Sequence, residues 1–447
     1  MELLNKEFIN NKNTKNFFIV FLFWFSMIFF SIYCSANVFL FDNRKNIFLL
    51  LLLFIPFCCL LYQSFSFILK KGLDNIKINY SFFPLIFFLL YISYRIMADK
   101  NEIKLLLFYS CGCFFFYLFG SLMSFVMKHI ELFNDKFKSI KKINFYYYIF
   151  YFFFTFILYV FCLIYLLPRC RNDYFLIDKF GFYQFPGDLM ILNTFMTSIL
   201  SVFILKRKPV ITIIPYFHFL YIFIIVVLSQ FIGSNKSFIV NLGIYIIYFS
   251  YYSFIKNRNN FDDYKCNKLT IILSWFSKLL KKYCFFICLI VALLFIYRGN
   301  YPKIRILNYN EASNYSFYIA RFLIIEKNFF EQFNLNPVVG NFNAEVLIGE
   351  KGYYPHSFIF SILTHSGIIG TSLMYFYLLY VIIDYFYSLK KLNNNIILYD
   401  KLFIFTLVIW IFIMANISSF FTWYPVWFAF GFGFPFLQER KLSISFK

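Results

Sequence analysis

Long apolar runs dominate this chain, and most are long enough to cross a bilayer as a single helix. About 20 apolar residues span the hydrocarbon core, where a helix satisfies its backbone hydrogen bonds within its own segment. Short stretches with Lys or Arg separate the runs. We therefore predict an all-α, polytopic membrane protein with about 12 transmembrane helices. The predicted spans are about 17–41, 47–69, 80–98, 103–127, 145–167, 187–205, 210–230, 237–255, 284–298, 357–389, 402–420 and 423–437.

The composition agrees with a membrane protein and argues against several function classes. Of the 447 residues, 61% are hydrophobic and 14% are charged, and a soluble domain of this length could not bury 73 Phe and 37 Tyr. The ten cysteines fall mostly inside apolar runs without metal-ligand spacing, so we predict neither a metal site nor a disulfide framework. We expect no nucleic-acid partner, because inner-leaflet anchoring accounts for most of the net charge of +21.

Basic residues are divided unequally between the two sides predicted for the loops. With the N-terminus in the cytoplasm, 27 of the 42 Lys and Arg residues lie on the cytoplasmic side. Cytoplasmic loops of membrane proteins carry an excess of Lys and Arg, so we predict that both termini are cytoplasmic. One of the predicted inside loops, 128–144, contains His129.

The chain divides at its longest outside segment. Residues 1–298 hold nine predicted spans, residues 299–356 form a large outside loop, and residues 357–447 hold the last three spans and a cytoplasmic tail. Within the loop, apolar residues recur at helical spacing over 311–333, and Arg321 borders this stripe. Arg321 is therefore either a partly desolvated anion ligand, whose planar guanidinium suits phosphate oxygens, or a side chain that reaches out to water.

The helix predicted over 357–389 has His356 at its first turn and two glycines further along. Because 11 residues make about three turns, we expect Gly367 to lie below His356 on one face, with Gly370 close to that face. A Gly-x-x-Gly pair predicts that a neighbouring helix approaches closely. A neutral His356 can take a proton from a hydroxyl, or it can serve as a helix cap. His365 points away from this face, and we interpret it as a buried structural histidine.

This stretch resembles a signature of one family of membrane enzymes. His356-Ser357, nine further residues and then Gly367-x-x-Gly370 are similar to the His-[Asn/Ser/Gln]-x9-Gly-x-x-Gly motif of bacterial O-antigen polymerases and O-antigen ligases. The 12-helix layout with one large outside loop near the C-terminal end also resembles that family. The resemblance implies a GT-C-like fold in the bacterial inner membrane, with the active site on the periplasmic side.

The loop before the motif resembles the same family, with Arg321 on a helix, followed by Pro337 and Gly340 and then the histidine. The resemblance implies a glycosyltransferase whose donor and acceptor are undecaprenyl-diphosphate-linked oligosaccharides, without metal or sugar nucleotide. In that reaction His356 would be the general base, and Arg321 would hold the departing diphosphate. A regulator of chain length is a further candidate partner.

The family also has a Ser-Arg element between two middle helices, and here the chain departs from it. The matching place, 229–237, has Ser234 followed by Asn235 and Lys236. Lys236 keeps the charge but lacks the bidentate fork of arginine. The remaining candidates for a second diphosphate ligand are Arg169 and Arg171.

Two other functions are alternatives to an O-antigen polymerase. A ligase that moves the finished glycan to lipid A-core shares the motif, and the divergent middle element favours the more variable polymerase group. A lipid-oligosaccharide flippase also typically has 12 spans. A transporter should carry charged residues deep in its spans, whereas most charges here lie at span ends.

Overall fold

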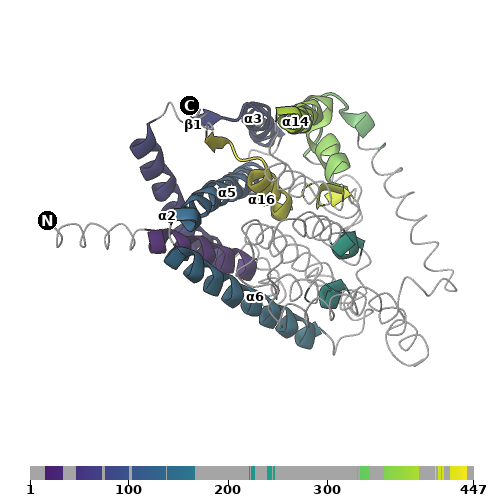
Figure 1. The fold of residues 1–447 in the computed structure, drawn as a ribbon. Helices are drawn as coiled ribbons and strands as arrows, with labels where there is room; N and C mark the ends of the chain where they lie inside the picture. Colours follow the sequence, from purple (N-terminus) through teal and green to yellow (C-terminus); the bar gives the residue numbers. More distant parts are fainter. Residues whose placement is uncertain are drawn as a thin grey trace. The chain divides into compact units, whose positions relative to one another are not determined.

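We describe the structure from a computed structural model of the full chain (Figure 1). Contacts divide the chain into two compact units, one of residues 1–36, 43–154 and 318–447, and one of residues 37–42 and 155–317. Nearly everything that follows belongs to the first unit. The residues that the structure describes are 16–33, 47–72, 76–99, 103–136, 138–166, 333–342, 357–391 and 423–439, with short pieces between 221 and 246, residue 330, and short pieces between 408 and 416.

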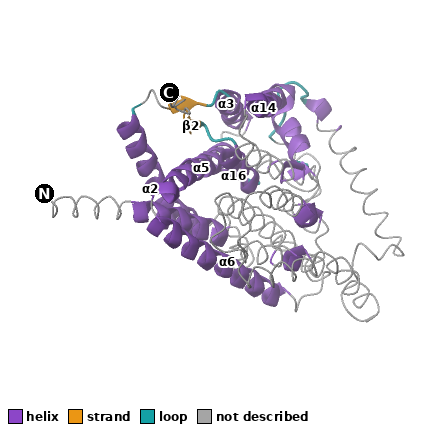
Figure 2. Cartoon of the chain, viewed as in Figure 1, coloured by secondary structure: helices purple, strands orange, loops and turns teal. Residues whose placement is uncertain are grey.

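The described part of the chain is mostly helical, as predicted (Figure 2). A first helix runs over Asn16–Tyr33. The elements that follow are α2 (Ile47–Lys71), β1 (Ile76–Ile78), α3 (Phe82–Asp99), α4 (Ile103–Leu106), the π-helical segment η3 (Leu107–Cys111), α5 (Gly112–Lys136), α6 (Lys138–Leu166), α14 (Phe358–Lys391), α16 (Tyr424–Gly433) and β2 (Leu437–Glu439). Among the described residues, five stretches are long and apolar enough to span a membrane, namely Asn16–Tyr33, Leu51–Lys70, Phe82–Asp99, Tyr109–Ile130 and Phe358–Ile383. The protein is therefore a membrane-embedded, helical one.

The segment predicted as the inside loop 128–144 is helical over most of its length. Helix α5 continues to Lys136 and α6 begins at Lys138, because Lys, Glu and Leu are good helix formers that extend a helix beyond its apolar run. His129 is consequently buried, at 1% exposure, with its ring stacked 4.0 Å from that of Phe67. The expectation that His129 lies in a loop was wrong.

Two short strands join segments that lie far apart in the sequence. β1 pairs with β2 antiparallel, with Ile76 opposite Glu439 and Lys77 opposite Gln438. Both strands must lie on the same side of a bilayer, because an open sheet edge is not tolerated in the hydrocarbon core. An even number of spans must therefore lie between them. The last predicted span, 423–437, contains only the ten-residue helix α16 and runs into β2, so it is shorter than the sequence predicted.

Helices α5 and α16 approach each other closely through two glycines. A Cβ atom at Gly120 would collide with the backbone of Phe428, and one at Gly431 would collide with the backbone carbonyl of Tyr117. Small residues allow helices in membranes to pack backbone against backbone. Around this contact the rings of Phe30 and Phe428 stack with centroids 3.9 Å apart. The core of this unit is thus built on α5 and the short helix α16.

Candidate functional site

The predicted straight helix over 357–389 is broken at Gly367. α14 covers this segment, but Gly367 has φ 61° and ψ −164°, which is not a helical conformation. Only glycine adopts this backbone region readily. The facial alignment predicted for Gly370 therefore fails, because it assumed regular rotation across residue 367.

Residues 336–342, which belong to the predicted outside loop, are bonded to α14 at this break. Asn341 N donates to Thr364 O at 2.9 Å, and Ile368 N donates to Pro337 O at 2.9 Å. In a continuous helix Ile368 N would donate to Thr364 O, so the loop supplies partners for both groups that the break releases. Ile369 N also donates to the loop, at 3.2 Å from Val338 O. Figure 2 draws the loop in teal next to α14.

Two glycines make this contact possible. Gly340 in the loop has φ 77°, and a Cβ atom there would collide with the backbone of His365 and Gly367. A Cβ atom at Gly367 would in turn collide with the backbone of Val338 and Gly340. The prediction that a neighbouring segment approaches Gly367 closely is confirmed, but that segment is the loop with Val338 and Gly340 and not a helix.

Gly370 faces a different environment from Gly367. A Cβ atom at Gly370 would collide with the side chain of Ser366 in the preceding turn and would lie 3.3 Å from Cδ1 of Tyr91. Tyr91 belongs to α3, which packs against α14. Gly370 thus lies where α3 and α14 meet, beyond the break.

Helix α3 holds the same loop from its other side. The Arg95 guanidinium donates from Nη2 to Asp99 at 2.8 Å and to the carbonyl of Gly340 at 3.1 Å. The Tyr91 hydroxyl donates to the carbonyl of Val339 at 3.1 Å. The Arg95 and Asp99 side chains are only 14% and 18% exposed, and a cation withdrawn from water needs such partners. The sequence indicated only that Arg95 lies near the end of a span.

An aromatic cluster closes the inner side of this contact. His365 is buried at 1% exposure, as predicted, and its Nδ1 lies 2.7 Å from the carbonyl of Ser361. Its ring centroid lies 5.4 Å from that of Phe342 in the loop and 6.0 Å from that of Tyr109 in η3. Phe342 of the loop is therefore packed against the core, and it is only 4% exposed.

The start of α14 is capped by two other polar side chains. Asn416 Oδ1 accepts from the amide of Ile359 at 2.9 Å and from the Ser357 hydroxyl at 3.1 Å. The Ser357 hydroxyl also accepts from the amide of Phe360 at 3.4 Å, as an N-cap serine does. Ser357 and Asn416 therefore cap the start of α14, and both roles predicted for His356 stay predictions.

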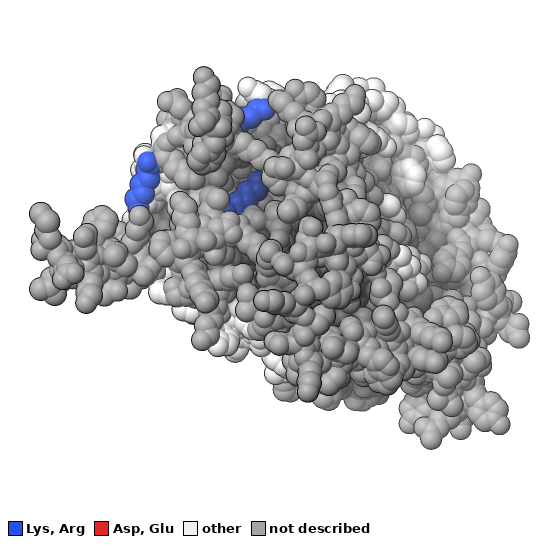
Figure 3. All heavy atoms as spheres, in the orientation of Figure 1, with Lys and Arg blue, Asp and Glu red and all other residues white. Residues whose placement is uncertain are grey.

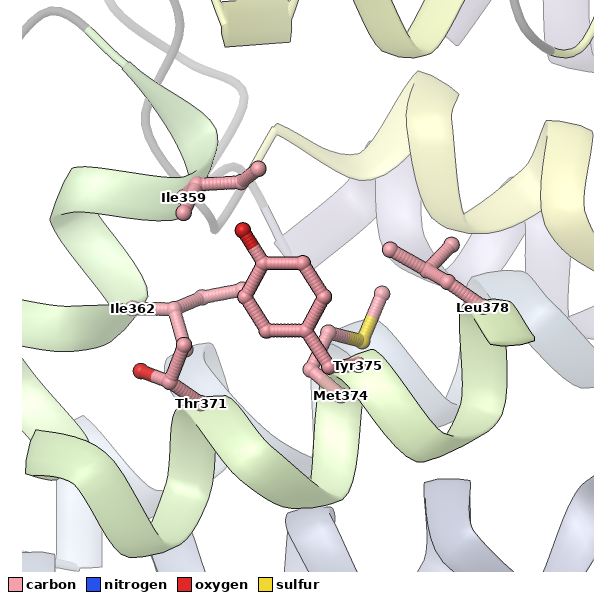
Figure 4. Close-up of a pocket in the computed structure, with 6 residues that line it drawn as sticks. All are labelled: Ile359, Ile362, Thr371, Met374, Tyr375 and Leu378. Carbon is pink, nitrogen blue, oxygen red and sulfur yellow. The ribbon is translucent and has the colours of Figure 1, made fainter. Parts of the chain in front are cut away.

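A small cavity lies beside the break in α14. It has a volume of about 10 Å³, close to that of one water molecule. Side chains from the parts of α14 before and after Gly367 converge on it, with the Tyr375 ring pointing toward Ile359 and Ile362 (Figure 4). A cavity of this size and apolar lining is not a substrate site.

Five of the predicted site residues lie outside the described residues. They are His356, Arg321, Lys236, Arg169 and Arg171. On the face drawn in Figure 3, the basic side chains of the described residues appear as separate spots and not as one patch. Among the described residues there is no group of three or more His, Cys, Asp or Glu side chains that could hold a metal ion.

The chain was compared with known protein families, curated proteins and solved structures. No protein-family model, no curated protein and no solved structure matches the chain.

Proposed function

We propose that this protein is an O-antigen polymerase, an inner-membrane glycosyltransferase that joins undecaprenyl-diphosphate-linked oligosaccharide units on the periplasmic side. The observation that carries the proposal is the backbone contact between Gly340 and Gly367. It gives a physical reason for the glycine that closes the His-Ser-x9-Gly motif: the glycine admits the outside loop to the helix that follows the histidine.

The described residues on either side of the segment that carries His356 are held by contacts. The segment of about 14 residues between Phe342 and Ser357 is fixed at both ends, since Phe342 packs on His365 and Ser357 is bonded to Asn416. Fixing both ends of a short loop reduces the entropy lost when its residues are oriented for reaction. A general base placed next to a capped helix start is therefore well supported for a transfer reaction.

The reaction requires one base and a cationic site for the leaving group. His356 takes the proton of the acceptor sugar hydroxyl, and the oxygen attacks the anomeric carbon of the donor. The bond to the lipid diphosphate breaks, and the diphosphate leaves with the electron pair. Arg321, with Lys236, Arg169 or Arg171 as the second cation, stabilises the charge that develops on it. Direct displacement predicts inversion at the anomeric carbon, without metal or sugar nucleotide.

Deletion of the gene followed by complementation tests the proposal. The deletion strain should accumulate lipid-linked repeat units on the periplasmic side, and the wild-type protein should restore a ladder of glycan lengths. His356→Ala and Arg321→Ala should each abolish the ladder, while Tyr94→Phe, a 67% exposed residue on α3, should not.

The same experiment separates the alternatives by where and how the glycan stops. Finished chains that remain on the lipid carrier and do not reach lipid A-core would indicate a ligase. Repeat units trapped on the cytoplasmic side would indicate a flippase. Either result would overturn the polymerase proposal.

A further inference from the structure

The contacts between α3 and the loop of residues 336–342 involve no residue of the His-Ser-x9-Gly motif, and Arg95 makes one of them. From α3, Arg95 reaches the carbonyl of Gly340 and Tyr91 reaches the carbonyl of Val339. These are consecutive carbonyls of the loop, and the amides of Asn341 and Gly340 are bonded to Thr364 and Asn336. The loop backbone is thus paired on both of its edges.

The loop contacts α14 more than one turn after the start of that helix. Thr364, the first α14 residue bonded to the loop, is six residues beyond Phe358 and so about 9 Å along the helix axis at 1.5 Å per residue. Irregular backbone at membrane depth persists only where its polar groups are paired inside the protein. The Gly340 carbonyl is paired by Arg95, so its burial depends on that side chain.

The charge of Arg95 is already compensated. Asp99, one helical turn further along, lies 2.8 Å from the same Nη2 that donates to Gly340. The carboxylate of Asp99 cancels the charge of the guanidinium and so weakens its attraction for a second anion, although the buried Nε has no hydrogen-bond partner among the described residues. This arrangement differs from the free cation that a departing diphosphate requires.

We infer that Arg95 is a positioning residue for the transfer reaction, which locks the loop of residues 336–342 into the break of α14 and does not bind the diphosphate. The inference rests on the proposed function for its effect on activity. Its structural part, the lock itself, can be measured without any substrate. Tyr91 adds a neutral bond to the same lock.

Hydrogen–deuterium exchange of the purified full-length protein in detergent tests the lock directly. In Arg95→Gln, the amides of Asn341, Ile368 and Ile369 should exchange at least about tenfold faster than in the wild type, because they bridge the loop and the helix. Arg95→Lys, which keeps the charge but loses the fork, should give an intermediate increase. Tyr94→Phe on the neighbouring exposed position is the control and should leave the exchange unchanged. Unchanged exchange in Arg95→Gln would overturn the inference.

A kinetic measurement then separates positioning from ligand binding. Lipid-linked repeat units purified from the deletion strain serve as the probe. Positioning predicts that kcat of Arg95→Gln falls at least about tenfold while KM stays within about threefold. A rise in KM at constant kcat would make Arg95 a substrate ligand and overturn the inference. Faster exchange in Arg95→Gln, together with a wild-type protein that does not elongate these units, would keep the lock and reject the proposed function.

Discussion

Gly340 and Gly367 face each other so closely that neither position leaves room for a side chain. Gly340 belongs to the loop of residues 336–342 and has φ 77°, and Gly367 breaks α14 with φ 61°. A Cβ atom on either would enter the backbone of the opposite segment. Two separate costs, strain in the backbone and overlap with the neighbour, therefore act against substitution at both positions.

Alanine substitution of this pair should release the loop. Gly367→Ala and Gly340→Ala each place a Cβ in a positive-φ conformation that costs about 1–3 kcal/mol, and the overlap should bring the loss of unfolding free energy to about 3 kcal/mol or more. The midpoint of thermal unfolding in detergent should fall in both variants. The glycan ladder should be weakened or lost.

Gly72 provides a matched control for these two substitutions. It has φ 79°, and nothing lies within 4 Å of a Cβ built on it. Gly72→Ala should therefore show the strain alone, about 1–2 kcal/mol. Equal losses of stability at Gly72 and Gly367 would contradict the importance of the loop contact.

The cap of α14 should be separable from its break. Asn416→Ala removes the acceptor of the Ile359 amide and should cost about 1 kcal/mol of stability. Glycan elongation should fall, because His356 directly precedes the capped turn. Asn416→Asp retains the acceptor oxygen for the cap but, like the alanine variant, loses the Nδ2 donor to the carbonyl of Phe412 at 3.0 Å, so it should keep more activity than the alanine variant and less than the wild type. A fully active Asn416→Ala protein would show that the cap has no part in the site.

Two glycines of the α5 core should differ in their tolerance of alanine. A Cβ at Gly431 would meet the backbone of Tyr117, whereas one at Gly112 would meet only the ring of Tyr424. Since a side chain can move and a packed backbone cannot, Gly431→Ala should lower the thermal midpoint clearly more than Gly112→Ala does. The reverse order of midpoints would refute the packing described for α5 and α16.

The strand pair should report which chain segments share a side of the membrane. Lys77 lies opposite Gln438 in the β1–β2 ladder, so Lys77→Cys with Gln438→Cys should form a disulfide under mild oxidation. Mass spectrometry of the linked peptide distinguishes this bond from any that involve the ten native cysteines. Lys70→Cys with Gln438→Cys is the control, because Lys70 lies in α2 and outside the ladder. Failure of the Lys77 pair to cross-link would contradict the ladder.

The lengths of the apolar runs were enough to predict a helical membrane protein and the positions of several of its helices. The predicted spans 47–69, 80–98 and 357–389 correspond to α2, α3 and α14, whose ends differ by at most two residues from those predicted. The burial of His365 was also predicted correctly. These features depend on the length and periodicity of apolar residues within one segment, which is local information.

The neighbours of each helix, by contrast, follow from contacts between segments that are far apart in the chain. The bond from Arg95 to Gly340 joins residues 245 positions apart, and the break at Gly367 exists because the loop supplies replacement partners for the helix backbone. Apolar periodicity carries no information on which distant backbone group will fill a gap. For the same reason the ladder between residues 76–78 and 437–439 and the contact of Gly120 with α16 were not predicted from the sequence. Runs of apolar residues in the sequence show where helices can cross a membrane. Contacts between distant segments decide where the backbone of a helix departs from regular geometry, as it does at Gly367.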